Sequence, residues 1–207
     1  EDSLKKNPDT KVVAFVHAET STGVRSDAKE IAEIAKKYGC LIIADTVTSF
    51  TGIPVLTDEW GLDAVYSGSQ KCLSCVPGLS PLTFSDKAIE KIQSRGTKIQ
   101  SWFLDQTLVL DYWSGTGKRS YHHTAPINSI FALHEALRLA CDETLENLWK
   151  RHLDAHFRLK QGLDSMSFDF VVEKKYRLPQ MNSIHIPEGC DDLEIRSKLL
   201  NDYNLEI

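Results

Sequence analysis

The sequence predicts an α/β protein with a three-layer, mainly parallel sheet. Its first half alternates apolar, β-branched runs with segments of helical spacing, beginning with KVVAFVHA and SDAKEIAEIAKKYG. Near-continuous apolar strands that alternate with helices are typical of a parallel sheet buried on both faces. The second half combines a long helix-forming stretch with shorter mixed runs, which predict the start of a smaller α+β unit.

The elements of the first half each have a local signal. The runs KVVAFVHA and CLIIADTV read as buried strands, AVYSG as a short strand, and LSPLTFSD as a further one. In the intervening helix, Ser26 is the candidate N-cap and Gly39 the candidate stop. Either Ser85 or Asp86 is expected to cap the helix DKAIEKIQSR.

The second half begins with a helical stretch, INSIFALHEALRLACDETLENLWKRHLDAHFRLKQGLDSM, which is expected to break near CDET with Asp142 as a cap. The run DFVVEKKYRLPQMNSIHIPEG predicts two strands, and DDLEIRSKLLNDY predicts a short amphipathic helix. The final NLEI looks like the start of another strand. An unpaired last strand would expose its ladder groups, so we expect a fragment of a longer polypeptide.

Composition argues against several classes of protein. The 207 residues carry a net charge of −5 and contain no basic run, which argues against nucleic acid as a partner. No apolar stretch approaches the roughly 18 residues of a membrane span. The five cysteines are few and odd in number, unlike a secreted disulfide framework. We therefore expect an intracellular protein, with cytoplasm, peroxisome and mitochondrion all compatible.

Two residues at strand ends are the strongest candidates for chemistry. Lys71 follows a buried strand among small residues, where an amine is expected to lose solvation and act as a nucleophile toward an aldehyde. A solvated loop lysine is the alternative. Asp45 ends the apolar run LIIAD, where a carboxylate is costly unless it meets a positive partner such as a protonated pyridine nitrogen. A turn or cap aspartate is the alternative.

Other polar residues leave their role open. The hydroxyls of HAETSTG could bind a phenolic oxygen or a phosphate, or form an ordinary turn. His17 could be a general base, although a hydrogen-bonded structural histidine fits its position better. Arg95 and Arg119 could meet a phosphate or a carboxylate, or stay solvated. The pair Cys72-x-x-Cys75 would need two further ligands to hold zinc, so we expect no metal site.

Five segments together resemble a known family. HAETSTG, IIADTVTS, YSGSQK, VPGLSPLTFS and SYHHTAP follow one another as in the alanine–glyoxylate / serine–pyruvate aminotransferase family, class V enzymes that use pyridoxal 5′-phosphate (PLP). The resemblance covers nearly the whole chain and implies fold type I, the aspartate-aminotransferase fold. It implies that residues 1–143 are part of a large PLP-binding domain and residues 144–207 part of a small C-terminal domain.

The resemblance also assigns roles to individual residues. Lys71 would form the Schiff base and shuttle a proton between the substrate Cα and the cofactor C4′. Asp45 would pair with the pyridine nitrogen, and Val47 would pack on one ring face. Thr20 stands where the family commonly has a serine beside the cofactor. The implied phosphate contacts are Gln70 and, from the neighbouring subunit of a homodimer, Tyr121 and Thr124.

The implied reaction transfers an amino group from alanine or serine to glyoxylate or pyruvate. The family's glycine-rich phosphate turn and its carboxylate-clamping arginine are not found in this sequence. We therefore expect a central fragment that binds PLP weakly and does not transaminate alone. One alternative is a PLP-dependent lyase similar to cysteine desulfurase, which needs a mobile catalytic cysteine. Alternatives of another class are a non-catalytic binding domain and a metal or redox CxxC protein.

Overall fold

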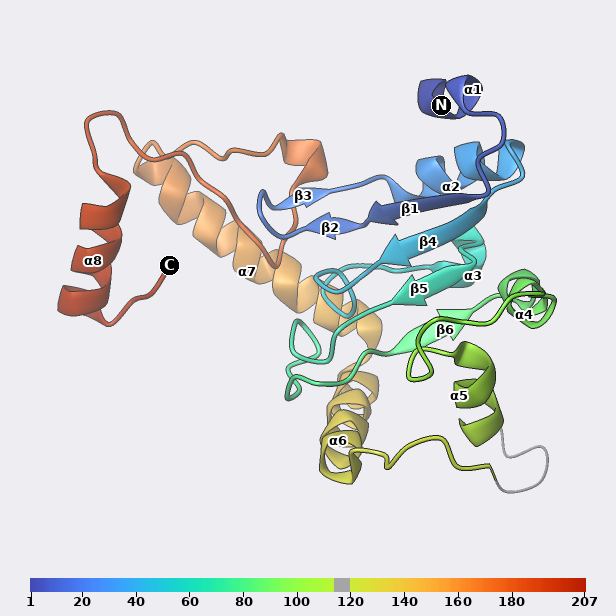
Figure 1. Cartoon of the computed structure of the whole chain (residues 1–207). Coiled ribbons are helices and arrows are strands. Elements are labelled where there is room, and N and C mark those ends of the chain that lie inside the picture. Colours follow the sequence, from blue (N-terminus) through green and yellow to red (C-terminus); the bar gives the residue numbers. More distant parts are fainter. Residues whose placement is uncertain (114–119) are drawn as a thin grey trace.

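A computed structural model describes residues 1–113 and 120–207 of the chain (Figure 1). The strands are β1 (Val12–Val16), β2 (Ala18–Glu19), β3 (Val24–Arg25), β4 (Leu41–Asp45), β5 (Ala64–Tyr66) and β6 (Leu82–Phe84). The α-helices are α1 (Asp2–Lys6), α2 (Ala28–Lys37), α3 (Thr57–Trp60), α4 (Asp86–Gln93), α5 (Gln106–Trp113), α6 (Ile127–Glu143), α7 (Leu145–Ser165) and α8 (Asp192–Tyr203). Among the described helices, none is long and apolar enough to cross a bilayer.

The main sheet has the strand order β1-β4-β5-β6. Strands β1, β4 and β5 are parallel, whereas β6 runs antiparallel to β5. The register places Val16 beside Asp45 and Asp45 beside Tyr66, so the last residues of three strands lie in one row. The α/β class and the mainly parallel sheet are therefore confirmed. The carboxyl ends of β1, β4 and β5 meet at one edge, where such sheets bind their ligands.

The described helices cover the sheet unevenly. On one face, Ala32 and Ala35 of α2 pack against Ile42 and Ala44 of β4 and against Val65 of β5. On the other face the apolar side chains are exposed, namely Val12, Val16, Tyr66 and Leu82. Cover on both faces was expected from the continuous apolar strands. The described residues provide it on one face only.

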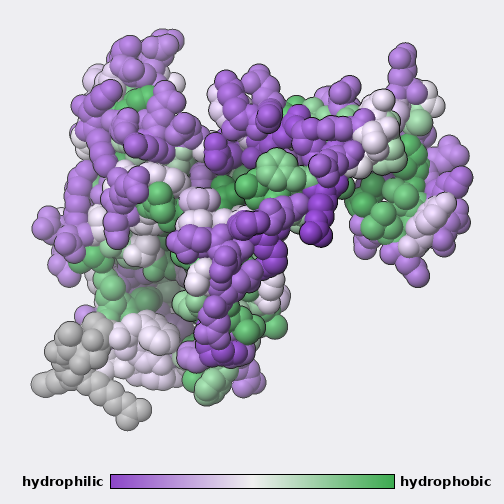
Figure 2. Space-filling model, turned by 180° about the vertical axis from the view of Figure 1, so that it is seen from behind, coloured by the Kyte–Doolittle hydropathy of each residue, from purple (hydrophilic) through white to green (hydrophobic). Residues whose placement is uncertain are grey.

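A second apolar cluster ties the C-terminal part of the chain to the site edge of the sheet. Leu178 is fully buried against Ala18 and Ile53, with Met181 packed beside them. In contrast, α8 has no buried residue and stands away from the sheet (Figure 1). Its exposed apolar residues and those of the chain end form the green patch at the right of Figure 2. The expected helix there is confirmed, but its apolar side chains are not packed.

Several local predictions need correction. The N-cap of α2 is Asp27, whose side chain accepts a hydrogen bond from the Glu30 amide, rather than Ser26. The break predicted near CDET is confirmed at Thr144, which has φ +69°, but Asp142 pairs with Arg138 instead of capping. The predictions of a stop at Gly39 and a cap at Ser85 are confirmed by the left-handed φ of +70° at Gly39 and the bond from the Ala88 amide to Ser85.

The two strands predicted in residues 169–189 are also wrong. That segment forms only isolated bridges, Phe170 with Ile184, Leu178 with Met181, and Arg177 with Val24, and it includes the short 3-10 turn Lys174–Tyr176. Single bridges do not make a ladder, because a strand needs a neighbour along several residues. Residues 204–207 have no strand conformation either, contrary to the expectation for NLEI.

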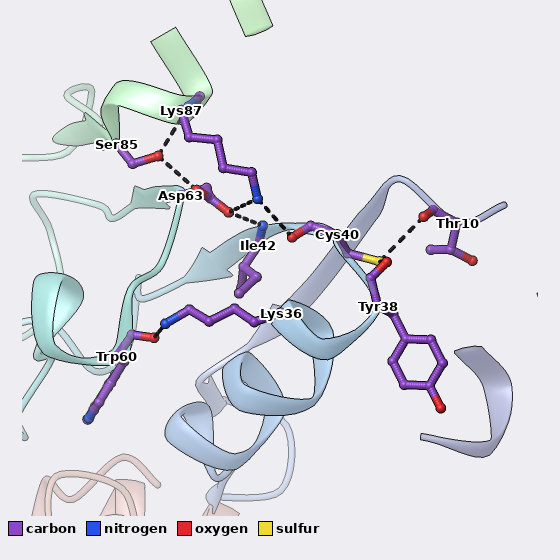
Figure 3. A network of polar contacts seen from close by, with 10 residues as sticks. Thr10, Lys36, Tyr38, Cys40, Ile42, Trp60, Asp63, Ser85 and Lys87 are labelled. Atoms are coloured by element: carbon purple, nitrogen blue, oxygen red, sulfur yellow. Dashed lines mark hydrogen bonds and ion pairs between the residues drawn. The ribbon is translucent and has the colours of Figure 1, made fainter. Parts of the chain in front are cut away.

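The amino end of the sheet is held by a polar network around Asp63 (Figure 3). The Asp63 carboxylate is buried and accepts hydrogen bonds from the Ile42 amide at 2.9 Å and from the Ser85 hydroxyl at 2.8 Å. The Lys87 ammonium lies 3.9 Å from the same carboxylate. These contacts join the start of β4, the start of β5 and the end of β6, so Asp63 stabilises the sheet.

Candidate active site

The candidate site lies at the carboxyl edge of the sheet. Three segments leave that edge: residues 17–26 after β1, residues 46–52 after β4, and residues 67–76 after β5. The first backbone bonds beyond the strands still follow the ladder, since the His17 amide donates to the Asp45 carbonyl and the Thr46 amide to the Tyr66 carbonyl, both at 2.9 Å. The three segments therefore start side by side.

Asp45 is half-buried at the end of β4, and two donors orient its carboxylate. Oδ1 accepts from the Val47 amide at 2.9 Å, and Oδ2 accepts from the Tyr66 hydroxyl at 2.7 Å. The bond to the carboxylate, followed by burial, raises the pKa of the Tyr66 phenol. The partners that the described residues give Asp45 are thus neutral. Val47 was expected on one face of the cofactor ring. Its backbone is held beside the Asp45 carboxylate by the amide bond to Oδ1.

Thr20 lies in the segment after β1, and its hydroxyl is 2.7 Å from the hydroxyl of Thr48 in the segment after β4. Close to this pair, the ring Nδ1 of His17 lies 3.0 Å from the Ser49 hydroxyl. The structural role expected for His17 is confirmed, because this histidine is buried and hydrogen-bonded. Thr20, Asp45 and Val47 are therefore brought together on two adjoining segments.

Lys71 sits in a turn after β5 that is fixed by backbone bonds. The Ser74 amide donates to the Lys71 carbonyl at 2.8 Å, and Ser74 takes a left-handed φ of +56°. The Ser69 hydroxyl closes the turn by donating to the Val76 carbonyl at 2.6 Å. The Lys71 side chain is nevertheless exposed, as is Gln70. The expected loss of solvation at Lys71 is therefore not seen: the turn packs through Leu73, which is buried, while the Lys71 side chain stays exposed.

Cys72 connects the lysine turn to the segment after β4. Its sulfur lies 3.7 Å from the Thr48 carbonyl, which also accepts from the Gln180 amide group at 3.0 Å. Gly52 allows this approach, since a Cβ there would stand 2.8 Å from the Cys72 sulfur and 3.0 Å from the Gln180 side chain. Burial raises the pKa of the Cys72 thiol. The Cys72 sulfur is therefore placed as a packed side chain and not as a mobile nucleophile.

Within residues 1–113 and 120–207, the remaining cysteines and Arg95 do not form a second site. All five cysteines are free, and the described residues contain no group of three or more His, Cys, Asp or Glu placed to hold a metal ion. Arg95 bonds to Thr97 within its own exposed loop. Arg119 lies outside the described residues.

Tyr121 and Thr124 lie in the segment before α6, apart from the three segments of the candidate site. Their hydroxyls are 2.6 Å apart, and both residues are exposed. Tyr121 packs edge-on against Tyr112 of α5, with ring centroids 6.0 Å apart. No contact found within residues 1–113 and 120–207 joins this pair to Asp45 or Lys71. Their expected role across a dimer stays a prediction.

Sequence reasoning missed Tyr66 and Gln180. Tyr66 ends β5 beside Asp45, a pairing set by the register of two parallel strands, which alternation of side chains along either strand does not fix. Gln180 reaches Thr48 from a position 132 residues further along the chain. A contact at that separation has no local sequence signal.

Comparison with known proteins identifies the family. The family model described as aminotransferase class-V matches residues 1–207. The chain belongs to this family. The resemblance found in the five sequence segments is thereby confirmed, and with it the fold type expected from them.

Individual class-V relatives agree with this assignment. The chain is 39% identical over 195 residues to alanine–glyoxylate aminotransferase of Rattus norvegicus, covering 93% of this chain and 47% of that protein. It is 32% identical over 215 residues to (S)-ureidoglycine–glyoxylate transaminase of Bacillus subtilis, covering 95% and 51%. The crystal structure of alanine–glyoxylate aminotransferase from Nostoc sp. superposes with a TM-score of 0.93 at 45% identity, covering 99% and 54%. The chain thus spans about half the length of these relatives.

Proposed function

We propose that this class-V chain is the central part of a PLP-dependent aminotransferase that moves an amino group from alanine or serine to glyoxylate or pyruvate. The observation that carries the proposal is the oriented carboxylate of Asp45 at the end of β4, next to the strand that leads into the Lys71 turn. The names of the relatives support glyoxylate as one acceptor.

The residues at this edge fit PLP. Asp45 presents a carboxylate whose described partners are neutral, which leaves its charge for the protonated pyridine nitrogen of the cofactor. Lys71 presents an exposed primary amine, the group that reacts with an aldehyde. Thr20 adds a hydroxyl for a phenolic oxygen, and Gln70 an exposed amide for the phosphate. When bound, PLP supplies the aldehyde and an electron-accepting ring.

The chain's own residues divide the work between binding and proton transfer. Lys71 Nζ would hold the cofactor covalently, and as a free amine it would take the proton from the substrate Cα. Asp45 would pair its charge with the ring nitrogen, and the bonds from Val47 and Tyr66 fix the direction of its carboxylate. Val47 would limit the ring position from one side.

The wider assembly follows from the same proposal. Residues 1–143 belong to a large cofactor domain and residues 144–207 to a small C-terminal domain, with the boundary at the sharp backbone turn of Thr144. The protein acts as a homodimer in which the exposed hydroxyls of Tyr121 and Thr124 reach the phosphate bound by the neighbouring subunit. An exposed position is what such a contact needs.

The lyase reading receives less support. A desulfurase needs a cysteine whose sulfur can swing to the substrate, whereas the Cys72 sulfur is directed at the Thr48 carbonyl and packed against Gly52. The class-V relatives named above are transaminases.

The test compares the full-length protein with the isolated 207-residue chain. Both are incubated with PLP, alanine and glyoxylate, and pyruvate and glycine are measured over time. The full-length protein should form both products in equal amounts, while the isolated chain should show no turnover and only weak PLP binding. Absence of transamination by the full-length protein with alanine and serine as donors would refute the proposal.

A further inference from the structure

Two side-chain bonds tie the segment after β1 to the segment after β4. Thr20 bonds to Thr48, and His17 bonds to Ser49, so neighbouring positions of the second segment each hold one residue of the first. The two bonds differ in environment. His17 and Ser49 are 2% and 0% exposed, whereas Thr20 is an exposed residue. The Thr20–Thr48 bond is therefore part-buried and the His17–Ser49 bond buried, and because water competes less with the buried bond, that bond is the firmer link.

His17 is held from several directions. Its amide donates to the Asp45 carbonyl and its carbonyl accepts from the Ser26 amide, both at 2.9 Å. Its ring packs edge-on against Trp60, with centroids 5.4 Å apart. The position of the imidazole is therefore determined by β4, by the approach to α2 and by α3. A ring fixed in this way can fix its hydrogen-bond partner.

The charge state of His17 supports this role. Burial, followed by the charge of Arg25, lowers the pKa of His17 to about 4, while Asp27 acts in the opposite direction. The ring is consequently neutral at physiological pH. A neutral imidazole can share one proton with a hydroxyl without the cost of a buried charge.

We propose that His17 is a positioning residue whose buried hydrogen bond with Ser49 fixes the spacing between Thr20 and Asp45 across the cofactor site. The inference rests on the proposed function, because it assumes that these two residues face one bound cofactor. It gives the imidazole no part in proton transfer. Loss of the bond leaves a buried polar group without a partner, and the segment after β1 is then held to the segment after β4 by the weaker Thr20–Thr48 bond alone beyond the end of the strand.

The test uses the full-length protein and two substitutions at one position. His17→Leu removes the ring nitrogen, whereas His17→Asn places an amide near the position of Nδ1 and can still bond to Ser49. PLP affinity is measured by visible absorbance. We expect the dissociation constant to rise at least about tenfold for His17→Leu and to return to within about threefold of wild type for His17→Asn, by analogy with the effect of supporting partners at cofactor and metal sites.

A double-mutant cycle isolates the bond itself. Ser49→Ala should raise the dissociation constant for PLP about as much as His17→Leu, and the double variant should be no worse than either single variant. Fully additive effects on PLP affinity would overturn the inference. If His17→Leu fails to fold, Ser49→Ala and His17→Asn still test the positioning role of His17. His17→Asn should then bind PLP more tightly than Ser49→Ala.

A matched control separates positioning from general stability. His156 is another buried histidine, 2.6 Å from the side-chain oxygen of Asn182, and it is not part of the site. His156→Leu should lower the free energy of unfolding and leave the dissociation constant for PLP within about twofold of wild type. An equally small effect of His17→Leu on PLP affinity would show that His17 is merely structural.

Failure of the wild-type protein to bind PLP would refute the proposed function rather than the positioning role. In that case amide hydrogen exchange of the cofactor-free protein decides the role. His17→Leu should accelerate exchange in residues 17–26 and 46–52 and leave β4 protected. Unchanged exchange in both segments would contradict it.

Discussion

Two aspartates at opposite ends of the sheet show how the same side chain serves different purposes. Asp63, at the amino end, is buried and meets the Ile42 amide, the Ser85 hydroxyl and the Lys87 ammonium (Figure 3). Asp45, at the carboxyl end, is half-buried and meets the Val47 amide and the Tyr66 hydroxyl. The fold supplies a cation to Asp63, whereas the donors described for Asp45 are neutral.

This difference separates a structural carboxylate from one available to a ligand. A carboxylate with a built-in cation has its charge compensated when the chain folds. A carboxylate that is oriented by neutral donors keeps a charge that can attract a cationic group from outside the chain. The comparison predicts that substitutions at the amino end change stability and that substitutions at the carboxyl end change cofactor binding and turnover.

The largest effect is expected at Lys71. In the full-length protein, Lys71→Ala should lower kcat by at least about 10³-fold, because general acid–base groups contribute up to about 10⁴. The melting temperature should hardly change, since the side chain is exposed. Steady-state kinetics and thermal unfolding measure both quantities.

Lys87→Ala is the matched control for that substitution. It removes the exposed lysine of the Asp63 network, so unfolding should become easier by less than about 1 kcal/mol while kcat is retained. Retention of normal turnover by Lys71→Ala would contradict the assignment of the carboxyl end as the catalytic end.

The next largest effect is expected at Asp63. Asp63→Ala leaves the buried Ile42 amide and the Ser85 hydroxyl without their acceptor, so the free energy of unfolding should fall by about 3 to 4 kcal/mol. Urea unfolding of the full-length protein measures this loss. A decrease below about 1 kcal/mol would show that water replaces the carboxylate and that the network is dispensable.

The pH dependence of stability should contain a contribution from His17. Its pKa is about 4 in the folded chain, below the ordinary value of 6.5, so the unfolded state binds more protons between these two pH values. The free energy of unfolding therefore falls as the pH decreases from 6.5 to 4, by about 2 to 3 kcal/mol for this group. Above pH 6.5 the contribution is constant.

The corresponding measurement is urea unfolding of wild type and His17→Asn between pH 7.5 and pH 4.5. The variant should lose less stability on acidification than wild type. If the free energies of unfolding of wild type and variant fell in parallel with pH, His17 would have the same pKa in the folded and unfolded states. That result would contradict a pKa lowered by burial.

The parts of the fold that follow from local sequence were predictable. The runs around β1 and β4 are long enough and apolar enough to identify strands, although β1 has no buried residue, and the glycine at position 39 marked the end of α2. Asp45 and Lys71 could be selected because strand ends in a parallel sheet converge at one edge. The cap of α2 was missed by one residue, since Ser26 and Asp27 are both good N-cap residues.

The remaining features depend on contacts between distant parts of the chain. Residues 169–189 have strand-like composition, but the two runs meet only around Phe170 and Ile184 and form isolated bridges. The exposure of Lys71 depends on what lies over its turn in space, which the adjacent sequence does not encode. The bond from Gln180 to Thr48 likewise joins residues that only the folded chain brings together.

We propose that Asp45 keeps its charge for the cofactor. The most direct measurement is a PLP titration of full-length wild type, Asp45→Asn and Asp63→Asn, followed by visible absorbance, with urea unfolding of the same samples. Asp45→Asn should raise the dissociation constant for PLP at least about tenfold, the equivalent of about 1.4 kcal/mol, and change the free energy of unfolding by less than about 1 kcal/mol. Asp63→Asn should destabilise the protein and leave PLP affinity within about twofold. Unchanged PLP affinity in Asp45→Asn would contradict the account.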